Sequence, residues 1–406
     1  MTNLGFIGVG GYGRAQLENF LPFHRAGRVR ITALADVSST ALEAASGIDG
    51  LERAQSFTDY AAMLSAADLD AVVISAPIPL HEEMTRRTAE RGLFALVEKP
   101  PVPLWSQLEG LIAADPRAKI MVGFQHVYSP LLQRMKEITW GGDIGQPLAF
   151  SGMGVWPRTS AYYDRAGWAG QLTWRGRATL DGPCTNGMSH FVNSLFFAGG
   201  ETRSGFATPR WLEGEAYRAR PVPSYDVGAL RGELDNGCEV SALFAHASAD
   251  TVPVCLQARG TKGSVTLTDN NKTLCDHAGR TTAGSDGRSE LVLAFLEMTE
   301  GRAESNLTPL TAMRDYVLAT NMMLQSSGGI HQIADQFVTV HDPASPGAVY
   351  GVAGLKDLFS HASERGASLR AVGAPWAIAP QRVRREEYDE NRLLQLLREG
   401  GSTRED

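Results

Sequence analysis

The residues of this chain best suited to chemistry are Glu98 and Lys99, which are followed directly by Pro100 and Pro101. They close the apolar run 93–97, which is typical of a buried strand. Charged side chains at the end of such a strand lie at the rim of a sheet, where open α/β folds bind ligands. A lysine that is desolvated there can lose its proton near neutral pH and act as an acid or base. The alternative is a solvated ion pair before a proline turn, and the residues nearer the N-terminus favour the site.

The chain begins with a glycine-rich segment of the kind that binds dinucleotides. Gly8, Gly10 and Gly13 have the G-x-G-x-x-G spacing, between a strand predicted over 4–7 and a helix predicted over 14–21. Gly8 allows a tight turn, Gly10 lets the backbone approach a pyrophosphate, and Gly13 lets the helix pack on the strand. The phosphates would then lie at a helix N-terminus.

A second apolar strand, predicted over 29–35, ends in Asp36. A carboxylate at this place, about twenty residues past the glycines, accepts hydrogen bonds from an adenosine ribose. Residues 37–41 include no cation that could hold a 2′-phosphate, so we expect NAD rather than NADP. NADP stays possible if an arginine arrives from elsewhere, and Arg14 is one candidate.

Strands and helices alternate through the rest of the N-terminal part. Strands are predicted over 70–75, 93–97 and 119–124, and helices over 80–91 and 104–113. This alternation predicts an α/β domain over residues 1–125, with a doubly wound parallel sheet that binds the dinucleotide.

After Phe124 the pattern changes to short alternating runs, which predict a second, α+β domain over residues 126–380 with an open, mostly antiparallel sheet. Strands are expected over 146–155, 211–219, 225–234, 238–247, 252–259 and 264–268. Helices are expected over 131–139, 186–198, 290–300, 310–326 and 352–363. Residues 381–406 form a charged C-terminal tail, expected as a loosely attached helix with a disordered end.

Several of these residues occur in an order and spacing that characterise a known family: Gly8, Gly10, Gly13, Asp36, Pro77, His81, Glu98, Lys99, Pro100 and the run Val122-Gly123-Phe124. They resemble the glucose–fructose oxidoreductase / inositol dehydrogenase (Gfo/Idh/MocA) family of NAD(P)-dependent oxidoreductases. The resemblance is close over the first half of the chain and looser over the C-terminal third. It implies a Rossmann domain that carries the cofactor and a second domain that supplies the substrate pocket and the oligomer interface.

By this resemblance Lys99 matches the family's catalytic lysine, and we expect the Lys99–Pro100 bond to be cis. His81 would line the cofactor cleft, although a solvated residue at a helix N-terminus is an open alternative. The residues expected to bind the cofactor are Gly8, Gly10, Tyr12, Gly13, Asp36, Ser75, Ala76, Pro77, His81, Glu98, Lys99 and Gln125.

The family also carries an Asp-x-x-x-His pair on a helix of its second domain. Here Asn186, His190 and Asn193 have the spacing of one helical face, and His190 matches the family's catalytic histidine. Asn186 and Asn193 stand where aspartates are usual. An asparagine can orient an imidazole but cannot stabilise its cation, so more of the acid/base work falls on Lys99. A packed histidine on a half-buried helix is the alternative for His190.

The segment 156–177 is rich in tryptophan, tyrosine and arginine. Aromatic rings stack on the C–H faces of a polar ring, and guanidinium groups donate to hydroxyls or carboxylates. We therefore expect Trp156, Arg165 and Trp168 to contact the substrate, together with Asn193. A subunit interface is enriched in the same residue types, so both interpretations stay open.

The composition narrows the class of protein. A net charge of −7 over 406 residues with no basic run argues against a nucleic-acid partner. No apolar stretch has membrane-spanning length, and the N-terminus does not have the form of a signal peptide. The 4 cysteines are scattered, which fits a reducing cytoplasm, and neither they nor the histidines have metal-ligand spacing. The resemblance implies a homodimer or homotetramer through the C-terminal sheet.

These observations favour an NAD(P)-dependent dehydrogenase of a sugar, polyol or related cyclic alcohol, in which Lys99 takes the hydroxyl proton as hydride leaves. Two other functions remain open. One is glycoside cleavage by transient oxidation with bound NAD. The other is a non-catalytic NAD-binding regulator, which the presence of Lys99 and His190 argues against.

Overall fold

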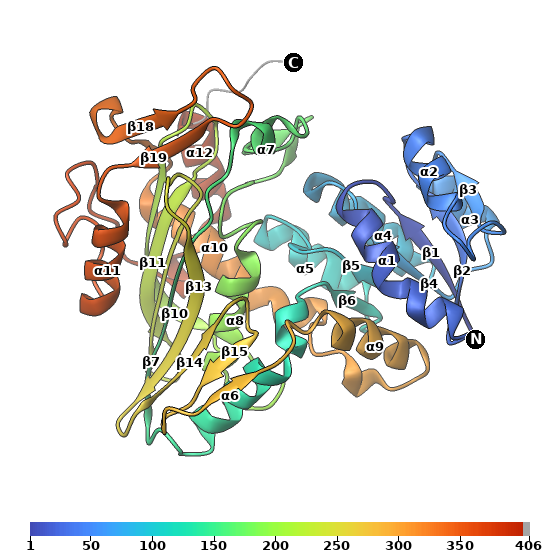
Figure 1. The fold of residues 1–406 in the computed structure, drawn as a ribbon, viewed down its shortest axis with the longest axis horizontal. Helices are drawn as coiled ribbons and strands as arrows, with labels where there is room; N and C mark the ends of the chain where they lie inside the picture. Colours follow the sequence, from blue (N-terminus) through green and yellow to red (C-terminus); the bar gives the residue numbers. More distant parts are fainter. Residues whose placement is uncertain (401–406) are drawn as a thin grey trace. The chain divides into compact units, whose positions relative to one another are not determined.

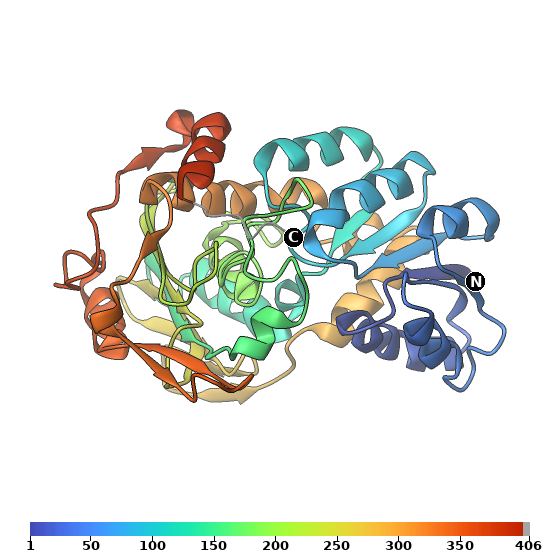
Figure 2. The ribbon, with the colours of Figure 1, turned by 90° about the horizontal axis from the view of Figure 1, so that it is seen from above.

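The computed structural model describes residues 1–400, which divide into two compact units (Figures 1 and 2). The first unit comprises Met1–Val102, Ser106–Tyr128 and Gly287–Met313. The second comprises Pro103–Trp105, Ser129–Asp286 and the chain from Arg314 onward. The expected disordered end of the tail falls on residues 401–406, outside the described residues.

The first unit contains a six-stranded parallel sheet with the order β3-β2-β1-β4-β5-β6. Its strands are β1 (Thr2–Ile7), β2 (Val29–Ala35), β3 (Gln55–Phe57), β4 (Ala71–Ile74), β5 (Phe94–Val97) and β6 (Ile120–Val122). The predicted doubly wound sheet is confirmed. The strand order reverses between β1 and β4, and open sheets of this kind bind ligands beyond the carboxyl ends of the strands at that point.

Helices α1 (Tyr12–Arg25), α2 (Ser39–Ser46), α3 (Tyr60–Ala66), α4 (His81–Glu90) and α5 (Trp105–Ala114) connect these strands. The sequence patterns did not predict α2, β3 or α3. β3 has only three residues, two of them exposed, so it lacks the apolar run that identified the other strands.

A late segment returns to the first unit. Helix α9 (Arg288–Thr299) places Phe295 edge-on to Phe20 of α1, with ring centroids 6.1 Å apart. Farther on, Thr308 extends the edge of β6, because its carbonyl accepts from the Val122 N–H at 2.9 Å. The sequence-based division had placed this segment in the second domain. A pairing across such a separation leaves no local pattern in the sequence.

The second unit contains a large mixed sheet with the order β16-β15-β14-β13-β7-β12-β11-β10-β17. Its main strands are β7 (Pro147–Val155), β10 (Pro209–Arg218), β11 (Val227–Leu234), β12 (Glu239–Ala245), β13 (Val252–Gly260) and β14 (Ser264–Thr268). Two short strands, β15 (Thr273–Cys275) and β16 (Thr281–Ala283), extend one edge. All six expected strands are present. The sheet is mostly antiparallel, as expected, but β7 runs parallel to β12 and β10 runs parallel to β17 (His331–Gln332).

Three helices pack on one face of this sheet: α6 (Pro130–Trp140), α8 (Ser189–Gly199) and α10 (Arg314–Ser327) (Figure 1). Glycines on the strands allow this close packing. A Cβ on Gly152 would lie 2.2 Å from the Phe191 ring of α8, and one on Gly214 would lie 2.5 Å from the backbone of Met323 in α10. The helix that carries His190 is therefore held directly against the sheet.

The opposite face is partly covered by the chain itself. Helix α11 (Leu355–Arg365) contributes Leu355, Phe359 and Ala362 to a core with residues of β7, β10, β11 and β12. We expected a homodimer or homotetramer to form through this sheet. Because α11 covers part of the face, only the uncovered part would be available for such a contact.

The C-terminal tail is bound to the second unit. Strand β20 (Val383–Arg384) pairs with β10, and α12 (Glu390–Gly400) packs on α10 with Leu393 and Leu397 buried. The expectation of a loosely attached helix is wrong, because these leucines give α12 an apolar face. Within residues 1–400, no helix has the length and apolar character needed to cross a bilayer.

Candidate functional site

The glycine-rich loop joins β1 to α1 and is shaped by close backbone contacts. Gly8 has φ +84°, and a Cβ there would lie 2.5 Å from the Ser75 carbonyl oxygen. A Cβ on Gly13 would lie 2.1 Å from the Gly8 carbonyl oxygen. Gly10 is different, because the atom nearest to a Cβ added there would be the Ala41 Cβ at 3.4 Å, which is an ordinary van der Waals contact. The fold itself therefore requires Gly8 and Gly13, whereas Gly10 has room.

Asp36 holds this loop. Its Oδ2 accepts hydrogen bonds from the backbone N–H groups of Val9 at 2.9 Å and Gly10 at 3.1 Å. Its Oδ1 accepts from the Ser38 N–H at 2.9 Å, where α2 is about to begin. A carboxylate has about four lone-pair sites, so three bonds leave it capacity for one more donor, such as a ribose hydroxyl.

The segment after Asp36 caps a helix. Ser38 is the N-cap residue of α2, and its hydroxyl accepts from the Ala41 N–H at 3.2 Å. Arg14, the candidate cation for a 2′-phosphate, donates to Glu18 at 2.8 Å and to the Ala44 carbonyl at 2.8 Å. Both contacts engage Arg14 within the protein.

His81 connects two loops at the carboxyl ends of the strands. It is 1% exposed, with Nδ1 2.7 Å from the Pro100 carbonyl oxygen and Nε2 2.8 Å from the Ala76 carbonyl oxygen. Burial lowers the pKa of His81, and the carbonyl oxygens of Pro100 and Ala76, which both need a donor, oppose that lowering. The alternative of a solvated residue at a helix N-terminus is therefore wrong. His81 ties the turn after β4 to the turn after β5, next to Lys99.

Glu98 is a buried carboxylate, 7% exposed, at the carboxyl end of β5. Its oxygens accept from the Gln16 side-chain amide of α1 and from the Lys99 N–H at 3.2 Å. Burial raises the pKa of Glu98, and the Lys99 charge and the Gln16 hydrogen bond oppose that rise. The alternative of a solvated ion pair is therefore wrong for Glu98. Lys99 is half-buried, and the Lys99–Pro100 bond is cis, as predicted.

Two buried polar atoms near the same strand ends bear on the cofactor. The Ser75 hydroxyl after β4 and the Gln125 Oε1 after β6 have no hydrogen-bond partner among residues 1–400. Together with the open Gly10 position and the remaining capacity of Asp36, they fit a dinucleotide, which carries both donors and acceptors. Within the same residues, no group of three or more His, Cys, Asp or Glu side chains could hold a metal ion.

In the second unit, α8 begins at Ser189, so Asn186 lies in the turn before the helix. The expectation that Asn186, His190 and Asn193 share one face of a continuous helix is therefore wrong for Asn186. His190 is half-buried in the first turn of α8. Asn193 is fully buried, and neither atom of its side-chain amide has a partner among residues 1–400.

Asp181 contacts the candidate site residue Asn186, and the sequence patterns did not identify it. Its Oδ1 accepts from the Asn186 side-chain amide at 2.7 Å, and its Oδ2 accepts from the Gly170 N–H at 2.7 Å. Arg165 lies 3.9 Å from the same carboxylate, which is 3% exposed. A buried carboxylate therefore stands five positions before Asn186, the position at which the family resemblance leads us to expect an aspartate. It fixes the Asn186 amide with the nitrogen toward Asp181 and the oxygen away from it.

The segment 156–177 folds into stacked arginines and aromatic rings. Arg165 lies 3.7 Å from the Tyr162 ring centroid and 4.8 Å from that of Trp168. Arg158 lies 4.7 Å from the Tyr162 centroid and 5.6 Å from that of Trp156. Trp156, Arg165 and Trp168, which we expected to contact the substrate, thus belong to one stacked group. This group contacts Asp181 through Arg165.

His246 also supports this region and was not identified from sequence. It is buried, its Nδ1 lies 2.9 Å from the Trp156 carbonyl oxygen, and burial, followed by the charge of Arg158, lowers its pKa to about 3. A Cβ on Gly187 would lie 2.8 Å from its Nε2. A neutral imidazole therefore packs directly against the turn that carries Asn186. A histidine near the end of a strand has no sequence signal that would predict this contact.

Residues 2–126 match an oxidoreductase family described as having an NAD-binding Rossmann fold. The chain is 35% identical to an inositol 2-dehydrogenase of Streptomyces avermitilis over 123 residues, which are 29% of this chain and 35% of that protein. It is 33% identical to a D-apiose dehydrogenase of Paraburkholderia graminis over 144 residues, which are 35% of this chain and 37% of that protein. The chain therefore matches little more than a third of the length of these curated relatives.

Solved structures extend the likeness of fold to both units. The WlbA dehydrogenase from Bordetella pertussis, in complex with NADH and UDP-GlcNAcA, matches with a TM-score of 0.68 at 20% identity, over 80% of this chain and 96% of that one. A levoglucosan dehydrogenase in complex with NADH and L-sorbose matches with a TM-score of 0.67 at 17% identity, over 80% of this chain and 97% of that one.

The glycine loop generates a first prediction. Gly13→Ala should lower the thermal stability of the apo protein, because its Cβ would meet a backbone carbonyl that cannot move aside cheaply. Gly10→Ala should leave apo stability nearly unchanged and weaken NAD binding at least tenfold, because its methyl group would occupy the approach to the phosphates. Calorimetric scanning and titration with NAD measure the two effects, and equal affinity of Gly10→Ala and wild type would contradict the assignment.

Asp181 generates a second prediction. Asp181→Asn places an NH₂ group against either the Gly170 N–H or the Asn186 amide, so one buried donor loses its acceptor. We expect the free energy of unfolding of the second unit to fall by about 1–3 kcal/mol in urea titrations. The control is Asp250→Asn, on an exposed loop of the same unit, which should have no measurable effect. Equal stabilities of the two variants would show that the Asp181 contacts do not hold the turn.

Proposed function

Because the chain belongs, through residues 2–126, to the Gfo/Idh/MocA family of oxidoreductases with an NAD-binding Rossmann fold, we propose that it is an NAD-dependent dehydrogenase acting on a CH–OH group of a sugar, polyol or related cyclic alcohol. The observation that carries the proposal is the half-buried Lys99 beside the buried Glu98, in the same unit as the glycine loop. The inositol and apiose dehydrogenases among the relatives support this class of substrate.

The first unit would hold the cofactor. The glycine loop and the N-terminus of α1 would bind the diphosphate, since backbone N–H groups at a helix start attract anions. Asp36 would accept from a ribose hydroxyl. When bound, NAD supplies the acceptor for the hydride that leaves the carbinol carbon.

Lys99 would move the proton. In its neutral form the amine accepts the hydroxyl proton of the substrate, and in its charged form it returns a proton in the reverse direction. The chain holds Lys99 in place through Glu98, which accepts from its N–H, and through His81, which binds the Pro100 carbonyl. Neither contact uses the ammonium group.

The second unit would bind the substrate. We assign this role to His190 and Asn186, and to Trp156, Arg165, Trp168 and Asn193. Asn186 can donate or accept a hydrogen bond but carries no proton of its own in acid/base exchange, because an amide does not titrate near neutral pH. Asp181 orients it, so we propose a binding role for Asn186 rather than a proton relay.

Self-association is part of the proposal. The uncovered part of the C-terminal sheet would form a homodimer or homotetramer, whose mass light scattering would measure.

A third prediction concerns cofactor choice. NAD should bind at least tenfold more tightly than NADP, because the adenosine ribose would meet the Asp36 carboxylate and the cap formed by Ser38, and Arg14 is already engaged. Calorimetric titration of the wild type with both cofactors tests this. Asp36→Ala should narrow the difference. Tighter binding of NADP by the wild type would show that the assignment is wrong.

A fourth prediction concerns the acid/base. Lys99→Ala should abolish turnover across a panel of sugars and inositols while NAD still binds. Asn186→Ala should reduce turnover less than Lys99→Ala does, and the reduction caused by His190→Ala should fall between the two. If Asn186→Ala proves as severe as Lys99→Ala, the division of labour is wrong. If no panel member reduces NAD in the wild type, the dehydrogenase proposal fails and the non-catalytic alternative gains support.

A further inference from the structure

The second unit carries an open cavity of about 600 Å³ that the proposed chemistry does not account for. It lies between the segment 160–176, the turn 220–223 and Tyr350 of β19 (Val349–Val352). From its lining and its place in the unit, we infer that it binds the second ring of a disaccharide or larger glycoside whose other ring is oxidised. This inference rests on the proposed function for the class of substrate.

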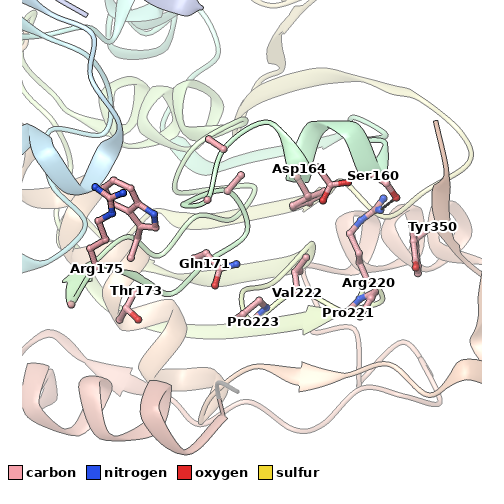
Figure 3. A pocket seen from close by; sticks show the side chains of 16 residues that line it. Ser160, Asp164, Gln171, Thr173, Arg175, Arg220, Pro221, Val222, Pro223 and Tyr350 are labelled. Carbon is pink, nitrogen blue, oxygen red and sulfur yellow. Dashed lines mark hydrogen bonds between the residues drawn. The ribbon is translucent and has the colours of Figure 1, made fainter. Parts of the chain in front are cut away.

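The cavity is elongated. Figure 3 shows Thr173 and Arg175 at one end, Gln171 and Val222 in the middle, and Arg220 and Tyr350 at the other end. Its volume corresponds to roughly 20 water molecules at about 30 Å³ each, which leaves ample room for one sugar ring. It also lies in the ordinary range of about 300–1,000 Å³ for small-molecule sites.

The lining combines aromatic faces with polar side chains. Trp174, Tyr163 and Tyr350 supply rings for stacking on the C–H faces of a sugar, and Gln171 and Asp164 supply groups for its hydroxyls. The Arg220 guanidinium lies 4.8 Å from the Tyr163 centroid and 4.3 Å from that of Tyr350. These three side chains form one wall of the cavity.

Two buried polar atoms of that wall lack partners. Arg220 is 4% exposed and donates to the Ser160 hydroxyl at 3.0 Å and the Arg158 carbonyl at 2.7 Å. Its Nε and the Tyr163 hydroxyl have no hydrogen-bond partner among residues 1–400. A wall built this way is satisfied more fully by a polar ligand than by an apolar one.

The charge around the cavity favours a neutral ligand. Arg175 and Arg220 line it together with Asp164. The buried Asp226 does not line it but accepts from the backbone N–H of Arg220 at 3.1 Å. Burial raises the pKa of Asp226, and the Arg220 charge opposes that rise. One carboxylate of the lining and one beside it thus offset the two guanidinium charges. A polyhydroxyl ligand suits this balance better than a phosphate or a dianion does.

The cavity and the proposed substrate residues share one side chain. Gly170, between the lining residues Ala169 and Gln171, donates to one oxygen of Asp181, and Asn186 donates to the other, each at 2.7 Å. A Cβ on Gly170 would meet Tyr163 at 2.8 Å and Val222 at 3.3 Å, both of which line the cavity. The wall of the cavity and the Asn186 amide therefore contact different oxygens of Asp181. This arrangement suits two linked sugar rings, one in the cavity and the other beside Asn186.

The test is calorimetric titration of the protein loaded with NADH, which cannot accept a hydride from a sugar, with maltose, cellobiose and lactose, compared with glucose and galactose. We expect at least one disaccharide to bind at least tenfold more tightly than its component monosaccharides. Trp174→Ala and Gln171→Ala should each reduce that preference at least tenfold. Trp211→Ala is the matched control, because Arg382 lies 3.7 Å from its ring centroid but Trp211 does not line the cavity. It should keep the preference.

The outcomes separate this inference from the proposed function, because binding is measured without turnover. If the disaccharide preference depends on Trp174 and Gln171 but NAD is never reduced, the inference stands and the dehydrogenase proposal fails. If monosaccharides are oxidised and every disaccharide binds no better than glucose or galactose, the inference is wrong and the dehydrogenase proposal stands. Thermal unfolding of each variant checks folding, and the milder Gln171→Ala decides if Trp174→Ala does not fold.

Discussion

The loops that carry the candidate site depend on carboxylates that accept hydrogen bonds from backbone N–H groups. Asp36 binds the N–H groups of Val9 and Gly10, Glu98 binds that of Lys99, and Asp181 binds that of Gly170. Loops lack the regular pairing of helices and strands, so a buried N–H there needs an acceptor from a side chain, another backbone group or water. A charged acceptor contributes more than a neutral one, roughly 1.5–3 kcal/mol per bond. The positions of the site residues follow from these few carboxylates.

This arrangement has an electrostatic cost that the surroundings offset. Burial raises the pKa of Glu98, and its hydrogen bonds and the Lys99 charge oppose that rise. Asp226 is fully buried, and burial raises its pKa to about 6 despite bonds from the N–H groups of Ala219 and Arg220. Near neutral pH the ionised form of Asp226 dominates, and it becomes protonated as the pH falls through about 6. The turn at Arg220 is therefore held by hydrogen bonds to Asp226, a carboxylate whose pKa lies close to neutral pH.

The sequence predicted the parts of the site that have local patterns. The glycine spacing, Asp36 at a strand end and Glu98-Lys99 before a proline all depend on neighbours along the chain, and so did the six main strands of the second unit. Gln16, Asp181 and His246 could not be found this way, because each acts through a contact with a distant segment or a turn. Gln16 left one signal, as a polar residue on the buried side of α1 beside Leu17 and Phe20. The return of α9 to the first unit left none.

Asn186, where the family resemblance leads us to expect an aspartate, is paired with a buried carboxylate from another position of the chain. A carboxylate is still present, at Asp181, but it is buried and already accepts from Gly170 and Asn186. A proton on Asp181 would add a donor where two donors already point, so protonation there would break a bond rather than form one. The amide of Asn186 cannot pass a proton on either. Under the proposed function, Asn186, oriented by Asp181, would position a substrate hydroxyl without deprotonating it, and the base would be a group outside this pair. Within the proposed chemistry that leaves the amine of Lys99 and the imidazole of His190, and only Lys99 stands on the unit that carries the dinucleotide loop.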